Sequence, residues 1–161
     1  LGMSERGVGE AFLILSLFNV IWFLVLAKLQ FWQFRMYPGL VSLGLRAVAL
    51  GILLVVTSRA GIMGCMIILG ITCAMAYSSS FFHGCSGSAN RAGRMAVHES
   101  VLASSNVAGA IIGGVVYQSG SALAAYLLAA AVTVAGLAGQ LYLAGRWKAR
   151  RSWVGRAGGG E

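Results

Sequence analysis

A chain of 161 residues that is 58% hydrophobic and 10% charged does not fit a soluble fold, because soluble domains carry about 25% charged residues. The net charge of +8 does not indicate nucleic-acid binding, because the basic residues stand at the ends of apolar stretches and not together on a polar surface. Composition therefore predicts that lipid surrounds most of the chain.

Five apolar stretches follow one another after a short extracytoplasmic N-terminal segment, 1–10. Each has close to the roughly 20 residues that a helix needs to cross about 30 Å of hydrocarbon. Backbone groups in lipid must find partners within their own segment, which favours helices. The predicted spans are 11–29, 39–57, 62–82, 100–118 and 121–144. The sequence predicts an all-α polytopic transmembrane bundle of five spans, followed by a basic cytoplasmic tail at 145–161.

Basic residues are unequally divided between the two sides that five spans define. Arg6 and Arg59 fall on one side. The opposite side receives Lys28, Arg35, Arg91, Arg94, Arg146, Lys148, Arg150, Arg151 and Arg156. Cytoplasmic loops of membrane proteins carry an excess of Lys and Arg. The charge pattern predicts a cytoplasmic C-terminus in a plasma or inner membrane.

Arg46 is a charged residue inside a predicted span, where a charge costs about 2.5 to 3.5 kcal/mol on insertion scales. It lies roughly 10 Å from Gly39 along a helix, within reach of the interface by snorkelling. One interpretation is therefore snorkelling or structural pairing, and the other is a functional role. We hypothesise a pair with Glu99, at the start of the fourth span, that closes the cytoplasmic side in one conformational state.

Uncharged polar residues inside the spans are candidates for a substrate path, although hydrogen bonding between helices is their usual role. Asn19 and Asn106 are the strongest candidates, because an amide that faces lipid is costly, and Tyr77 is an amphipathic neighbour.

The fourth span carries small residues at helical spacing. Ser105, Gly109 and Gly113 form one row, and Ala110 and Gly114 form a parallel row. Such a strip lets another helix pack closely, either statically or as a surface on which helices rock.

The region around this strip resembles a known family. Arg91–Ala92–Gly93–Arg94, then His98–Glu99, then Gly109–Ala110–Ile111–Ile112–Gly113–Gly114 resemble the cytoplasmic connection and eleventh helix of major facilitator superfamily transporters. Ala110 stands where proline is common in that family, so a less kinked helix is expected. The resemblance implies that the five spans correspond to helices eight to twelve of a secondary active transporter. It also implies alternating access for a small solute of unknown identity, and adds Arg91, Arg94 and His98 to the candidate cytoplasmic gate.

Other classes of protein remain to be compared with a transporter. The alternative is a self-contained membrane subunit or scaffold that packs with a larger membrane partner. An enzyme is not expected, because the sequence offers no metal triad, phosphate-binding loop or nucleophile with its base, and no cofactor or metal is expected. The expected partners are membrane lipids and either further N-terminal helices of the same polypeptide or a partner membrane chain. A start at Leu1 predicts that sequence precedes it.

Overall fold

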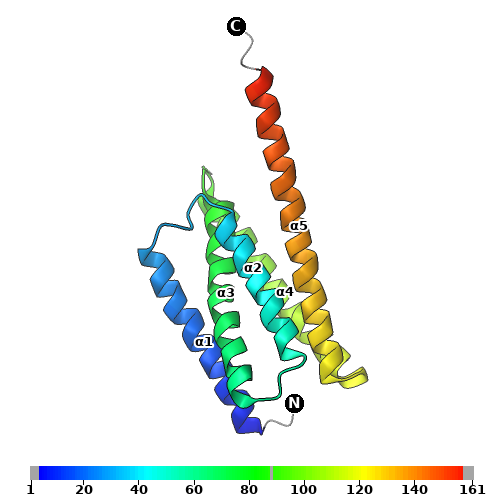
Figure 1. Ribbon diagram of the computed structural model, residues 1–161. Coiled ribbons are helices and arrows are strands. Elements are labelled where there is room, and N and C mark those ends of the chain that lie inside the picture. Colours follow the sequence, from blue (N-terminus) through cyan, green and yellow to red (C-terminus); the bar gives the residue numbers. More distant parts are fainter. Residues whose placement is uncertain (1–3, 88, 158–161) are drawn as a thin grey trace.

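Five α-helices joined by short connections form the computed structural model, which describes residues 4–87 and 89–157 (Figure 1). The helices are α1 Glu5–Lys28, α2 Tyr37–Leu53, α3 Arg59–Cys85, α4 Arg91–Ser119 and α5 Ala122–Ala157. Successive helices alternate in direction along the bundle. The predicted all-α helical bundle is confirmed.

Four helices, α1, α3, α4 and α5, are long and apolar enough to cross a membrane, which supports a multi-pass membrane protein. The second predicted span is shorter than expected, because α2 has 17 residues and reaches roughly 25 Å. It ends at Leu53, and the N–H groups of Leu54 and Val55 bond three residues back, to Gly51 and Ile52. The run Val55–Val56–Thr57 is β-branched, which disfavours continuing the helix.

Side-chain caps set where three of the helices begin. Ser4 accepts a hydrogen bond from the Gly7 N–H, so α1 already includes much of the predicted N-terminal segment. Ser58 caps α3 in the same way, by accepting from the Gly61 N–H. Asn90 Oδ1 accepts from the Gly93 N–H at 3.0 Å and starts α4 at Arg91. The residues between 91 and 99, which were expected in a connection, are therefore helical.

The alternating helices define two ends of the bundle. At one end, here called the basic end, α1 and α3 finish and α2 and α4 begin, which brings Lys28, Arg35, Arg91 and Arg94 to the same end. Helix α5 passes this end and continues to Ala157, well beyond the predicted limit of its span (Figure 1). Of the predicted tail, 158–161 and the side chains of Lys148, Arg150, Arg151 and Arg156 lie outside the described residues.

Helix α3 is the centre of the packing, and it contacts α1, α2 and α4. One core cluster joins α2 and α3, and the other joins the end of α1 to α3. The first contains Ala49, Leu53, Ile62, Cys65 and Leu69, and the second contains Leu26, Trp32 and Met75. Trp32 Nε1 donates to the Leu26 carbonyl oxygen at 3.1 Å, which fixes the connection that follows α1.

Two close contacts fix the position of α3 between its neighbours. Gly70 lies against the α1 backbone, where a Cβ atom would collide with the carbonyl oxygen of Leu15 and lie 3.1 Å from the Asn19 nitrogen. On the other side, the buried Ser42 Oγ donates to the Thr72 carbonyl oxygen at 3.0 Å. Small residues and interhelical hydrogen bonds are the usual means of helix association in lipid.

Candidate functional site

A cluster of polar side chains joins α3 to α4 near the basic end. The Tyr77 hydroxyl donates to Glu99 Oε1 at 2.6 Å, and Ser80 Oγ lies 2.9 Å from His98 Nε2. His98 Nδ1 is 3.5 Å from Glu99 Oε1, but it is buried without a hydrogen-bond partner in the described structure. We call Tyr77, Ser80, His98 and Glu99 the polar cluster.

Aromatic rings enclose the His98 side of the polar cluster. The His98 ring makes edge contacts with Tyr77 and Phe81, with ring centroids 5.6 and 5.9 Å apart. Phe23 of α1 packs edge-on against Tyr77 at 5.5 Å. The His98 side chain is 17% exposed, whereas that of Glu99 is 52% exposed. The cluster therefore holds a partly exposed carboxylate beside a sheltered imidazole, and a hydrogen bond to a charged acceptor is stronger than a neutral one.

The remaining predicted gate residues are divided between two places. Arg94 Nη1 donates to the Gly84 carbonyl oxygen at 3.3 Å, so Arg94 ties the start of α4 to the end of α3. Arg91 is exposed at the first position of α4. Arg46 is not brought to Glu99, because α2 and α4 make no contact in the described structure, and Glu99 is bound by Tyr77. An Arg46–Glu99 pair stays a prediction for another conformation.

Arg46 lies on the face of α2 that packs against α3. Its neighbours on that face are the buried Ser42, Ala49 and Leu53, which follow the spacing of one helix stripe. The Arg46 side chain is half-buried, and its Nε is fully buried without a hydrogen-bond partner in the described structure. The sequence placed Arg46 within a span but gave no sign of which face it occupies.

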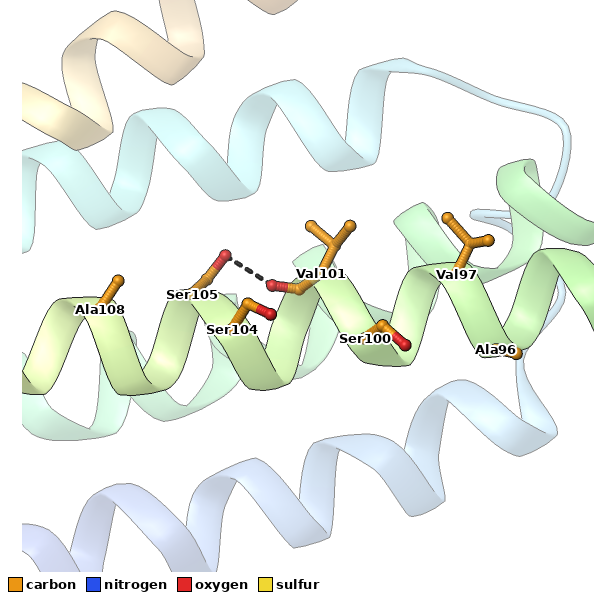
Figure 2. A pocket seen from close by; sticks show the side chains of 7 residues that line it. All are labelled: Ala96, Val97, Ser100, Val101, Ser104, Ser105 and Ala108. Carbon is orange, nitrogen blue, oxygen red and sulfur yellow. Dashed lines mark hydrogen bonds between the residues drawn. The ribbon is translucent and has the colours of Figure 1, made fainter.

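A shallow open hollow follows one side of α4 (Figure 2). Figure 2 shows its lining side chains along successive turns of this single helix, with Ser105 Oγ donating to the Val101 carbonyl oxygen at 2.7 Å. The lining consists of Ala96, Val97, Ser100, Val101, Ser104, Ser105 and Ala108. Alanine and valine make most of this surface apolar, and the hydroxyl groups of Ser100, Ser104 and Ser105 add polar atoms along it.

The predicted small-residue strip continues from this hollow along α4. Ser105, Gly109, Ala110 and Gly114 are exposed, and Gly113 is half-buried. A Cβ atom on Gly109, Gly113 or Gly114 would meet nothing within 4 Å. No residue of α4 is fully buried, and the open glycine positions show that the strip makes no close helix contact within the described chain.

The three candidates for a substrate path lie in different surroundings. Asn19 is half-buried on α1, where its backbone nitrogen faces Gly70. Tyr77 belongs to the polar cluster, and Asn106 is exposed on α4. No contact in the described structure brings the three together, so their shared role stays a prediction.

The opposite end of the bundle holds an ion cluster that the sequence analysis missed. Glu10 of α1 accepts hydrogen bonds from Arg59 of α3 and from Arg6 Nε, the latter at 3.2 Å. The spacing of Arg6 and Glu10, four residues on one helix, is a signal that could have been used. The pairing with Arg59 has no local signal, because it depends on how α1 and α3 pack.

Two further features bear on the chemistry. Cys65, Cys73 and Cys85 are free thiols, and no group of three or more His, Cys, Asp or Glu side chains within the described part could hold a metal ion.

No model of a known protein family matches the chain, and neither does any curated protein or any solved structure.

Proposed function

We propose that this chain is part of a secondary active transporter that moves a small solute across a membrane by alternating access. The observation that carries the proposal is the open surface of α4, which combines hydroxyl groups, small residues and glycines and which no helix covers in the described structure. Hydroxyl groups and glycines are enriched where membrane helices meet, and on α4 they stand among exposed valines and isoleucines. This surface is suited to face a second helical unit across a path that contains water.

The sequence resemblance supports the same function. The resemblance compares α4 with the eleventh helix of major facilitator transporters. All three parts of the resembling motif lie on this helix: the basic segment from Arg91 to Arg94, the pair His98–Glu99 and the small-residue strip. The basic end is then cytoplasmic, as expected from the distribution of Lys and Arg. The polar cluster would hold α3 and α4 together near the cytoplasmic mouth of the path.

A scaffold that packs with a larger membrane partner is the alternative, and the same α4 surface favours it. Small residues exposed in a row also suit static packing against a helix of another chain. The two functions differ in one testable property, because a transport path admits water from both sides whereas a packed interface excludes it.

Cysteine accessibility in native membranes tests this difference. With Cys65, Cys73 and Cys85 replaced by alanine, Ser104→Cys and Ser105→Cys report on the hollow. Val132→Cys, on an α5 residue that is 64% exposed, is the matched lipid-facing control. We expect a charged, membrane-impermeant thiol reagent to label positions 104 and 105 when added to either side, and to leave position 132 unlabelled.

If positions 104 and 105 are not labelled from either side and instead cross-link to another helix, the result would contradict the transporter and support the scaffold. An antibody against the chain, used to size the native polypeptide, then shows whether the covering helix belongs to the same polypeptide or to a partner chain.

A further inference from the structure

We infer that Arg46 is the binding group for a small anion, a carboxylate or a phosphate, and that the transported solute is therefore an anion. The inference rests on the proposed transport function, because it names the chemical class of the solute. It starts from the position of a positive charge for which the described structure shows no balancing charge.

The position of Arg46 is set by the packing of α2. The stripe of Ser42, Arg46, Ala49 and Leu53 faces α3, so the guanidinium group leaves the helix on its protein side and not towards open lipid. Arg46 is near the middle of a helix of 17 residues, roughly 13 Å along the axis from Tyr37. Side chains on a helix lean towards its N-terminus, so the guanidinium is directed towards the basic end.

The two acidic side chains that the structure describes are engaged away from Arg46. The sequence has four acidic residues, Glu5, Glu10, Glu99 and Glu161. Glu10 binds Arg6 and Arg59 at the end opposite the basic end, and Glu99 accepts from Tyr77 of α3 on a helix that α2 does not contact. The side chains of Glu5 and Glu161 lie outside the described residues.

An arginine in this setting favours an anion from outside the chain. Leaving a buried charge uncompensated is strongly destabilising, and charged residues within spans are found paired or on a solute pathway. The planar guanidinium presents parallel N–H donors that match the two oxygens of a carboxylate or phosphate. Nε, one of these donors, is buried and unpartnered, and the side chain as a whole is half-buried.

The first experiment measures anion-linked stability of the protein as purified from its native membrane, in nanodiscs of neutral phosphatidylcholine. The probes are succinate, benzoate and inorganic phosphate, with glucose and choline as uncharged and cationic comparisons. The variants are Arg46→Gln and Arg46→Lys. Lys28→Gln is the control, because it removes one positive charge from an exposed position at the basic end.

We expect at least one of the three anions to raise the Tm of the wild type and of Lys28→Gln in proportion to its occupancy. Arg46→Gln should lower the affinity for that anion at least tenfold. Arg46→Lys should lower the affinity less, because the positive charge remains although the two parallel donors of the guanidinium are lost. Glucose and choline should leave the Tm unchanged.

A second arm repeats the measurement in nanodiscs that contain phosphatidylglycerol. Stabilisation by this lipid alone, lost in Arg46→Gln, keeps the anion site but assigns it to a lipid phosphate and overturns the solute assignment. If no anion and no anionic lipid acts, or if Arg46→Gln responds as the wild type does, the inference is wrong. The proposed function is tested separately by labelling at positions 104 and 105, which does not involve Arg46.

A measurement on the unmodified protein covers the case in which Arg46→Gln does not fold. Phenylglyoxal modifies arginine guanidinium groups, and mass spectrometry reports each site. The stabilising anion should protect Arg46 and leave Arg91 reactive. Equal modification of Arg46 with and without every probe would overturn the inference.

Discussion

Helices α1–α3 and helices α4–α5 use their surfaces differently. Among the described side chains, every buried residue lies between Ala11 and Ser79, and α4 contributes none. Exposure alone does not separate the two regions, because α1 also exposes Phe12, Leu13 and Leu24. Both helices expose large apolar side chains, and the difference is that α4 also exposes hydroxyl groups, an amide and glycines among its valines and isoleucines.

This contrast distinguishes a surface made for lipid from a surface made for protein or solute. Large aliphatic and aromatic side chains are favourable in hydrocarbon, whereas small and hydroxyl-bearing residues are enriched where helices meet. Burial within the chain therefore marks the structural core, and the hydroxyl groups and glycines on α4 mark the surface that the proposed function would use.

The largest expected effect on stability is at the α1–α3 contact. Gly70→Ala should destabilise the bundle by about 2 to 3 kcal/mol, because the new Cβ would collide with the Leu15 carbonyl oxygen, a backbone atom that cannot move aside locally. Gly64→Ala is the matched control on the same helix, where a Cβ meets nothing within 4 Å, and its stability should be unchanged or slightly raised. Reversible unfolding in mixed micelles measures both. Equal stability of the two variants would refute the close contact.

The polar cluster should contribute a smaller, measurable coupling between the two regions. A double-mutant cycle of Tyr77→Phe and Glu99→Gln should give an interaction free energy of about 1 to 2 kcal/mol, since a charge-assisted hydrogen bond of 2.6 Å joins them. Tyr142→Phe with Glu99→Gln is the control cycle, because Tyr142 contacts Arg146 on α5. A Tyr77–Glu99 coupling no larger than that of the control would show that the hydrogen bond does not hold α3 to α4.

A single interhelical hydrogen bond inside the packed region should have a smaller effect still. Ser42→Ala removes the hydroxyl that donates to Thr72, and should cost about 0.6 kcal/mol, the average for such bonds in a membrane protein. Ser104→Ala, on the exposed side of α4, should cost less than the error of the same unfolding measurement. A larger loss for Ser104→Ala than for Ser42→Ala would reverse the assignment of core and functional surface.

We expect the smallest effect on stability in the small-residue strip. A substitution there should also separate stability from function most clearly. Gly113→Leu should change the stability of the chain by less than about 0.5 kcal/mol, because its Cβ position is open. It should nevertheless abolish the two-sided labelling of Ser105→Cys, because leucine blocks the approach of a second helical unit. Gly139→Leu on α5, also at an open position, should preserve both properties. Unaltered labelling in Gly113→Leu would mean that position 113 does not face the second helical unit.

The sequence was enough to predict a bundle of five helices, but not how the helices face one another. Hydrophobic length predicts a span whichever way it rotates, because in lipid the outer face is as apolar as the inner face. The contact at Gly70 and the Tyr77–Glu99 hydrogen bond depend on that rotation, so no local sequence pattern predicts them. The early start of α4 did have a local signal, the cap at Asn90, but the glycine and arginine content of the segment favoured a connection instead.

The continuous α5 helix has a mechanical consequence. Its 36 residues form a rod of roughly 54 Å, of which one part lies beside α2 and α4 and the rest projects beyond the basic end (Figure 1). A continuous helix that tilts as one body rotates about the segment that packs against the neighbouring helices. A small tilt of α5 within the bundle is therefore amplified at Ala157, in proportion to that residue's distance from the pivot. Spectroscopic probes placed near this far tip would follow motions of the bundle that are too small to resolve at its core.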